Sequence, residues 1–329
     1  MPRLGVVGTM VWDTIHMPDA RRETPVEGWG GIAYALAAAD AALPRDWSIF
    51  PIIKVGRDLR GLADGFFATL VKLDSLSGVR SVPEPNNRVE LSYHTAGRRC
   101  ERLTGGVPAW EGEEILPLVR SCDALYVNFI AGWELDLGSS AALRDAVDGP
   151  VYCDIHSLML GVGPDGVRVL RPLENWRAWL GAFDIVQVNE EELATLADGR
   201  DDPWSIAAEV LGPHTQAILV TLGERGAAWI STKPFRERCL EPGPLMPEAV
   251  PLVRGRLEAE STVPNADPTG CGDVWGATCF SALLGGWGLE AAVCHAGRTA
   301  AKNAAFVGTT GLNDELRSPP GLVEGGGMG

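Results

Sequence analysis

The segment that most constrains this chain is the heptad Asp267 to Asp273, Asp-Pro-Thr-Gly-Cys-Gly-Asp, which runs directly into an apolar stretch typical of a helix. Gly270 and Gly272 flank one small residue, Cys271, and so allow the backbone to turn its N–H groups toward one point. The positive end of the following helix adds to that field, and the loop is predicted to bind an anion. Asp273 either caps the helix, as acids in first turns often do, or acts as a base beside the anion.

Net charge limits the class of partner. The 329 residues include 43 acidic and 28 basic side chains, which gives a formal net charge of -15. That charge disfavours non-specific binding to nucleic acid and attraction to anionic membranes, and it favours small-molecule partners. With 46% hydrophobic residues, the chain suits one large α/β domain over residues 1–329, with a flexible glycine-rich tail at 320–329.

Cysteine usage and hydropathy predict a cytoplasmic protein. The seven cysteines form no C-x-x-C pair, and their odd number is typical of a reducing compartment. No zinc-ligand spacing occurs among the cysteines and histidines. The sequence has no uncharged apolar run of roughly 18 residues and no signal-peptide pattern at its start, so we expect neither a membrane span nor export.

Alternating strand and helix signals predict a doubly wound, mostly parallel α/β sheet with helices on both faces. Apolar, partly β-branched runs predict the strands, which we expect at 4–7, 47–55, 124–128, 151–154, 185–188 and 217–221. Runs of helix formers predict the main helices, which we expect at 32–43, from 58 to about 73, at 193–197, 273–285 and 289–307.

Two stretches interrupt this alternation. Residues 88–102 alternate polar and apolar side chains around an Ala96-Gly97 turn, which predicts a half-exposed β-hairpin. Residues 14–29 lack periodicity and are expected to form a loop or short edge strands. Together they make a candidate β lid inserted in the βα series, and a plain surface hairpin is the alternative.

Several motifs follow strands at their carboxyl ends, where parallel sheets collect ligands. Asp13 follows the first strand, and Asn189 to Glu192 follow a later one, either as a solvated helix cap or with one acid facing the ligand crevice. Gly30-Gly31 opens a helix, which permits close approach of a ligand or simply close packing. Thr221 to Ala227 joins two strands through a turn that could lie against a nucleotide or be an ordinary hairpin.

The order of these parts resembles the ribokinase family of carbohydrate and nucleoside kinases, also called the PfkB family, over nearly the whole chain. The heptad matches the family's D-T-x-G-x-G-D signature, with Pro268 in place of the usual Thr. Residues 30–43 resemble its N-terminal Gly-Gly motif, 189–192 its N-x-x-E motif, and 221–227 its T-x-G-x-x-G strand pair. Each motif alone is weakly specific, but the four in the family's order indicate a ribokinase-like fold.

The resemblance implies transfer of the γ-phosphoryl group of ATP to a hydroxyl of a sugar-like or nucleoside-like substrate. Asp273 would be the base that takes the hydroxyl proton, and the N–H groups of Gly270, Cys271 and Gly272 would form the anion hole. Family members often pair through their lids, so a homodimer through the lid is also an expectation. A nucleotide- or sugar-binding regulator of the same fold is the alternative function.

The resemblance also implies the cofactors, ATP and Mg²⁺, and leaves a monovalent cation open. Glu192, with Asn189, would hold Mg²⁺ through water. The remaining residues expected at the nucleotide are Thr221, Gly223, Gly226 and Asn303. Cys271 lies beside a helix start, so its thiol is either reactive with a lowered pKa or a small inert filler.

On the acceptor side, Asp13, Gly30 and Gly31 would hold hydroxyl groups, with Trp12 beside them. The family commonly has a sugar-binding Asn where an ungapped comparison places Ala35. Loss of a buried polar contact is worth roughly 1 to 3 kcal/mol, enough to change which polyol is preferred. We therefore expect an enzyme other than a standard ribokinase, acting on a less hydroxylated, base-bearing or otherwise modified sugar.

Overall fold

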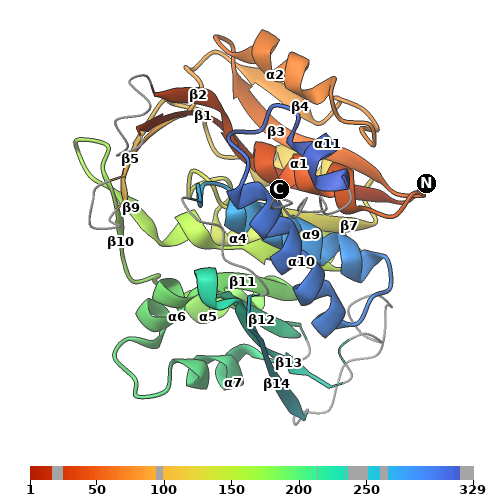
Figure 1. The fold of residues 1–329 in the computed structure, drawn as a ribbon, viewed down its shortest axis with the longest axis vertical. Helices are drawn as coiled ribbons and strands as arrows, with labels where there is room; N and C mark the ends of the chain where they lie inside the picture. The colour runs from red at the N-terminus through yellow and green to blue at the C-terminus, as the bar shows by residue number, and fades with distance from the viewer. Residues whose placement is uncertain are drawn as a thin grey trace, which may run out of the picture.

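The structure is built on one large sheet. A computed structural model describes residues 1–16, 25–93, 99–212, 214–233, 235, 251–259 and 266–318. The strand order is β14-β13-β12-β11-β8-β7-β1-β3-β4 (Figure 1), in which β13 is antiparallel to both neighbours and every other adjacent pair is parallel. The strands are β1 (Arg3–His16), β3 (Ser48–Gly56), β4 (Val79–Val82), β7 (Ala124–Asn128), β8 (Val151–Asp154), β11 (Ile185–Asn189), β12 (Ala217–Thr221), β13 (Ala227–Thr232) and β14 (Leu252–Leu257).

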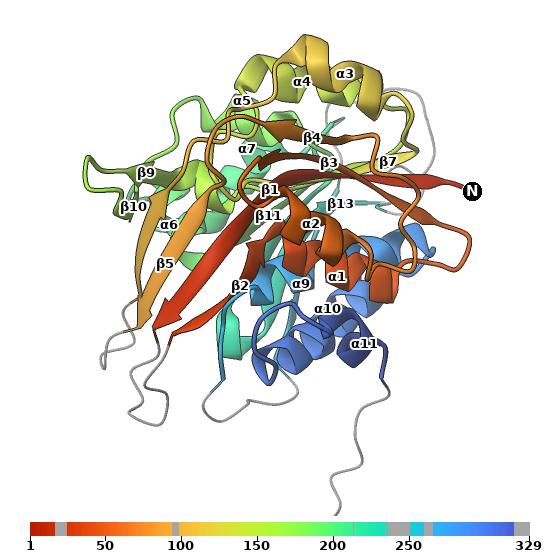
Figure 2. The ribbon, with the colours of Figure 1, turned by 90° about the horizontal axis from the view of Figure 1, so that it is seen from above.

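Helices cover both faces of this sheet (Figure 2), and each layer buries its own apolar cluster. One face carries α1 (Ile32–Ala42), α2 (Arg60–Phe67), α9 (Cys271–Leu284), α10 (Leu289–Ala304) and α11 (Leu312–Arg317). The other carries α3 (Gly112–Val119), α4 (Leu137–Ala146), α5 (Trp176–Gly181), α6 (Glu190–Ala197) and α7 (Ala207–Val210). The predicted doubly wound α/β class is confirmed.

Most predicted elements agree within about three residues, and two differ by more. The helix expected to reach about residue 73 ends at Phe67, because the chain then turns back to the sheet, where Ile49 N–H donates to the Lys72 carbonyl at 2.8 Å. The first strand continues to His16 instead of ending at Val7. Its second half leaves the large sheet and pairs with other strands.

That second half of β1 belongs to a smaller β layer. It pairs antiparallel with β2 (Val26–Gly31) and parallel with β5 (Arg88–Tyr93), and β5 pairs antiparallel with β6 (Arg99–Thr104). The predicted 88–102 hairpin is thus confirmed as β5 and β6. Parts of the candidate lid, residues 17–24 and 94–98, lie outside the described residues, as does the predicted tail at 320–329.

A short hairpin, β9 (Leu160–Val162) and β10 (Arg168–Leu170), braces the outer strand of this layer. Leu103 N–H donates to the Gly166 carbonyl at 2.8 Å, and the buried guanidinium of Arg168 donates to Glu101 at 2.7 Å. The same guanidinium donates to the Ile130 carbonyl at 2.9 Å. The β9–β10 hairpin therefore connects the smaller β layer to the rest of the protein.

Helix α9 carries the heptad into the core. It packs against α1 and α10, and its residues from Val274 to Leu283 are buried. Its apolar surface is thereby covered by protein. Within the described ranges, no helix combines the length and the apolar character that crossing a membrane requires.

The closest approach of α9 to the sheet depends on Gly276. A Cβ there would lie 2.2 Å from Gln187 Oε1 and 2.7 Å from the Tyr126 hydroxyl. We predict that Gly276→Ala destabilises the protein by about 1 to 3 kcal/mol, because two buried polar side chains must move. Gly297→Ala in α10, where a Cβ would meet nothing within 4 Å, should be neutral or stabilising by up to about 1 kcal/mol. Urea unfolding measures both, and equal effects would contradict this account of the packing.

Candidate active site

The heptad forms a tight loop at the start of α9. Gly270 is the N-cap residue with φ +73°, and a Cβ there would lie 2.3 Å from the Tyr34 ring, so both conformation and space favour glycine. Asp267 Oδ1 accepts hydrogen bonds from the Thr269 N–H at 3.0 Å and the Thr269 hydroxyl at 2.6 Å. The loop is thus held from within and backed by an aromatic ring of α1.

The backbone N–H groups of Gly270, Cys271 and Gly272 differ in whether they have a hydrogen-bond acceptor. The Cys271 N–H donates to the Pro268 carbonyl at 3.1 Å. The N–H groups of Gly270 and Gly272 have no acceptor among the described residues. Unpaired N–H groups at a helix start attract anions, so these two glycines are the donors that remain available to a ligand.

Asp273 lies over the carboxyl end of β7. The side-chain amide of Asn128, the last residue of β7, donates to Asp273 Oδ1 at 2.6 Å. The buried Tyr126 hydroxyl, two residues earlier on the same strand, donates to the Asp273 carbonyl at 3.4 Å. These contacts fix the orientation of a half-buried carboxylate beside the two glycine N–H groups.

Gln187 of β11 connects this loop to the next strand. Its Nε2 donates to the Gly272 carbonyl at 3.1 Å and to Asp154 Oδ2 at 2.9 Å. Its Oε1 accepts from the Tyr152 hydroxyl at 2.7 Å. The buried side-chain amide of Gln187 therefore connects β8, β11 and the heptad. Both its N–H₂ group and its carbonyl oxygen are hydrogen-bonded.

Asp154, Glu192 and Asp273 place three carboxyl groups at one edge of the sheet. Burial raises the pKa of Asp154 to about 8, His156 opposes that rise, and the carboxylates of Glu192 and Asp273 add to it. A proton on Asp154 near neutral pH lowers the repulsion within this group.

The N-x-x-E segment forms a capping box at the start of α6. Asn189 Oδ1 accepts from the Glu192 N–H at 2.9 Å, and Glu192 Oε2 accepts from the Asn189 N–H at 2.8 Å. Glu192 is only 2% exposed, and its Oε1 lies 2.5 Å from His156 Nδ1. In the described part of the chain, no three acidic, histidine or cysteine side chains converge as ligands on one metal position.

The acceptor-side residues lie together where β1 passes into the smaller layer. Asp13 is 5% exposed, and a Cβ on Gly30 would lie 1.8 Å from its carboxylate. Gly31 has φ +57° and caps α1. Trp12 and Trp29 pack edge to face with ring centroids 5.2 Å apart. Ala35, one turn into α1, is buried.

The nucleotide-side residues divide into two groups. Gly223 (φ +58°) and Gly226 (φ +90°) shape the turn between β12 and β13 that follows Thr221. Asn303 is instead 1% exposed, and its amide donates to the Thr269 carbonyl at 2.9 Å and to Cys271 Sγ at 3.4 Å. Asn303 thus braces the heptad loop, a role that the sequence did not predict.

The surroundings of Cys271 bear on the two interpretations of its thiol. Burial raises the pKa of its thiol to about 11, although the Asn303 amide opposes that rise. A thiol with a raised pKa is a poor nucleophile at neutral pH. The raised pKa favours the interpretation of Cys271 as a small filler over that of a thiol with a lowered pKa.

Four polar residues of this site were absent from the predicted site: Asn128, Asp154, His156 and Gln187. The strands that carry three of them were predicted, and Asn128 and Asp154 end their strands, so position at a carboxyl end was an available signal. Gln187 gave no such signal, because a polar residue inside an apolar strand is recognisable only once its partners are known.

The raised pKa of Asp154 predicts a pH dependence of stability. Between its ordinary pKa of 3.8 and about 8, the folded protein binds more protons than the unfolded chain, so stability falls as pH rises. This one group contributes at most about 1.4 kcal/mol per pH unit. We expect Asp154→Asn to reduce the slope of unfolding free energy between about pH 5 and pH 8, measured by urea unfolding in EDTA. The control Asp148→Asn, at an exposed position without an ion pair among the described residues, should keep the wild-type slope, and an unchanged slope in Asp154→Asn would contradict the assignment.

The chain is similar to solved structures, but its sequence matches no protein-family model and no curated protein. A pyrophosphate-dependent kinase in the ribokinase family has a TM-score of 0.73 at 15% identity, covering 95% of this chain and 99% of that chain. Arabidopsis thaliana ribokinase, complexed with ribose and ATP, has a TM-score of 0.64 at 19% identity, covering 97% and 99%.

A third similar structure is a nucleoside kinase. The Burkholderia thailandensis enzyme, in complex with inosine, has a TM-score of 0.67 at 18% identity, covering 95% of this chain and 95% of that chain. All three matches extend over almost the whole of both chains. The sheet order, the two helical layers and these matches agree, and the chain has the ribokinase-like fold.

Proposed function

We propose that this protein is a kinase that transfers the γ-phosphoryl group of ATP to a hydroxyl of a small sugar-like or nucleoside-like substrate. The observation that carries the proposal is the position of Asp273, which Asn128 orients at 2.6 Å beside the available N–H groups of Gly270 and Gly272. A carboxylate next to an anion site suits a reaction in which a proton must leave a hydroxyl as that hydroxyl attacks a phosphate.

In this proposal Asp273 is the base. It would accept the proton of the acceptor hydroxyl while that oxygen bonds to the γ-phosphorus and the bond to the β–γ bridging oxygen breaks, so that ADP leaves. Asn128 would keep the carboxylate turned toward the acceptor. The N–H groups of Gly270 and Gly272 donate to the transferring phosphoryl group and stabilise its charge. Cys271 contributes its backbone turn to the loop and no chemistry from its thiol.

The polar groups near Glu192 fit Mg²⁺ held through water. Both Glu192 oxygens already accept hydrogen bonds from Asn189, and Asn128 Oδ1 is buried with no donor among the described residues. Mg²⁺ normally keeps several waters and combines one or two carboxylates with phosphate oxygens. When bound, it would neutralise charge on the phosphates of ATP. Thr221, Gly223 and Gly226 would lie along the nucleotide.

Asn303 would support the nucleotide side indirectly, by holding Thr269 and Cys271 in place. ATP is the donor that we propose because Arabidopsis ribokinase, which has the same fold, binds it together with ribose.

The acceptor is proposed to lie between Asp13 and Asp273. Asp13 would accept a hydrogen bond from a substrate hydroxyl, and Gly30 leaves room for that carboxylate. The half-buried Trp12 ring, which packs on the buried Trp29, offers apolar surface there, which suits a base or a deoxygenated carbon better than another hydroxyl. The smaller β layer would act as the lid over this substrate and exclude water, and pairing of two copies through it remains a prediction.

Asp273→Asn should lower kcat by about 10² to 10⁴-fold, because the base is lost while the loop is kept. The measurement is ADP release with a panel of sugars and nucleosides, together with Mg·ATP binding, which should persist. Asp314→Asn is the matched control, because Asp314 occupies the same position in α11 after a left-handed glycine cap, Gly311.

The Asp314→Asn control should keep wild-type turnover, because it removes a carboxylate from the first turn of a helix that is not part of the proposed site. Full turnover by Asp273→Asn would show that the base is wrongly assigned. A wild-type protein that binds Mg·ATP and phosphorylates no alcohol of the panel would instead be a nucleotide-binding regulator.

The acceptor prediction concerns the order of kcat/KM within the same panel. We expect nucleosides or less hydroxylated sugars to exceed ribose and fructose by roughly tenfold or more, because Ala35 supplies no polar contact. Asp13→Asn should lower kcat/KM for every accepted substrate and leave the Kd of Mg·ATP unchanged. Efficient phosphorylation of ribose or fructose at the level of the best nucleoside would contradict this prediction.

A further inference from the structure

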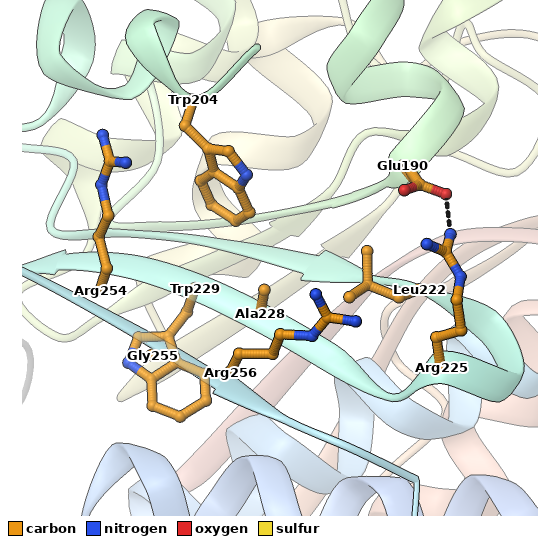
Figure 3. Close-up of a pocket in the computed structure, with 9 residues that line it drawn as sticks. All are labelled: Glu190, Trp204, Leu222, Arg225, Ala228, Trp229, Arg254, Gly255 and Arg256. Carbon is orange, nitrogen blue, oxygen red and sulfur yellow. Dashed lines mark hydrogen bonds and ion pairs between the residues drawn. The ribbon is translucent and has the colours of Figure 1, made fainter. Parts of the chain in front are cut away.

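A second groove lies on the opposite side of the large sheet from α9 and α10. It has a volume of about 410 Å³ and runs over β12, β13 and β14 beneath α6 and the 3₁₀ turn η2 (Pro203–Ile206), as Figure 3 shows. We call it the arginine groove and define it by the six residues Trp204, Leu222, Arg225, Ala228, Arg254 and Arg256.

Three guanidinium groups concentrate positive charge in this groove. Arg254 and Arg256 are two residues apart on β14, so both side chains leave the same face of the strand. Arg225 reaches the groove from the turn η3 (Gly223–Arg225) and pairs with Glu190 at the start of α6. In a chain with net charge -15, such a cluster is a local exception.

These guanidinium groups retain donor capacity. The Arg225 and Arg254 side chains are 57% and 61% exposed, and the only ion pair of Arg254 among the described residues, with Asp202, is 3.9 Å long. Arg256 has no hydrogen bond or ion pair in the described part of the chain. Arginine forks match the oxygen geometry of phosphate groups, so the free donors define an oxyanion as the complementary ligand.

Apart from Glu190, which pairs with Arg225, the remaining side chains of the groove are apolar. Trp204 points from η2 toward the strands, and Leu222 and Ala228 lie across from it (Figure 3). Trp204 is only half buried, so its indole offers a flat apolar surface beside the guanidinium groups. An inorganic anion would bind the guanidinium groups but would make no contact with the indole of Trp204.

We propose that the arginine groove binds a phosphorylated small molecule that carries a flat ring, with its phosphate on Arg254 and Arg256 and its ring against Trp204. The groove is separate from the site proposed for ATP, since it lies across the sheet from the amino end of α9. Its ligand would therefore be an effector, neither phosphoryl donor nor acceptor.

The walls of the groove couple it to the proposed nucleotide site, and this step rests on the proposed function. Leu222 and Arg225 belong to the Thr221–Ala227 turn, and Glu190 belongs to the helix that begins with the Asn189–Glu192 capping box. A phosphate held on Arg254 and Arg256 that also draws Arg225 away from Glu190 loosens the tie between the turn and α6. By linkage, the effector and ATP then change each other's affinity by the same factor.

The test is binding of 1-naphthyl phosphate, a ring-bearing phosphate that is not a nucleotide. Isothermal titration is performed at low salt with saturating Mg·ADP, so that the proposed donor site is already filled. We expect saturable binding that falls at least tenfold in Arg254→Gln/Arg256→Gln and stays unchanged in the charge-matched control Arg45→Gln/Arg120→Gln, whose side chains are exposed and unpaired among the described residues. Trp204→Leu should weaken 1-naphthyl phosphate more than inorganic pyrophosphate.

The outcomes separate this proposal from the proposed kinase activity. Because the readout is binding, a protein without turnover can still confirm the groove, and an active kinase can still lack it. No saturable binding, or equal binding by the Arg254→Gln/Arg256→Gln variant, would overturn the proposal. Equal weakening of both probes by Trp204→Leu would overturn the assignment of the ring to the indole.

Discussion

The junction between the amino end of α9 and the carboxyl ends of the central strands is the interaction on which the site depends. Two side-chain amides make it: Asn128 donates to Asp273 at 2.6 Å, and Gln187 donates to the Gly272 carbonyl at 3.1 Å. Both amides are buried, where hydrogen bonds are stronger and unpaired polar groups cost more than in water. The helix start therefore has one favoured position over the sheet, which fixes the glycine N–H groups and the carboxylate together.

This junction also concentrates negative charge. Asp154, Glu192 and Asp273 approach one another at the edge of the sheet, and His156 supplies the nearest compensating group. A raised pKa of Asp154, to about 8, follows from its burial and its neighbours. An edge that holds carboxylates beside anion-binding N–H groups is suited to a ligand that carries both cation and phosphate, and Mg·ATP has that composition.

Local sequence signals predicted most of the fold because strands such as 124–128 and 151–154 are continuous apolar runs between breakers. The same signals predicted the tight turn at the start of α9, where Gly270 has φ +73°. They missed Asn128 and Gln187, because each depends on a partner 145 or 85 residues away in sequence. The full length of β1 was also missed, since residues 12–16 are held by pairing with β5 and β2 and not by a hydrophobic run of their own. The contact of Asn303 with the heptad loop was not predicted for the same reason, since Thr269 is 34 residues away in sequence.

The central claim is that the heptad loop receives the γ-phosphate with Asp273 on the acceptor side. A crystal structure with Mg²⁺ and a non-hydrolysable ATP analogue tests it most directly. We expect γ-phosphate oxygens within about 2.7 to 3.2 Å of the Gly270 and Gly272 N–H nitrogens, with Asp273 facing the space next to the phosphorus. A nucleotide bound with its γ-phosphate away from these two glycines, or with Asp273 turned into the protein, would contradict it.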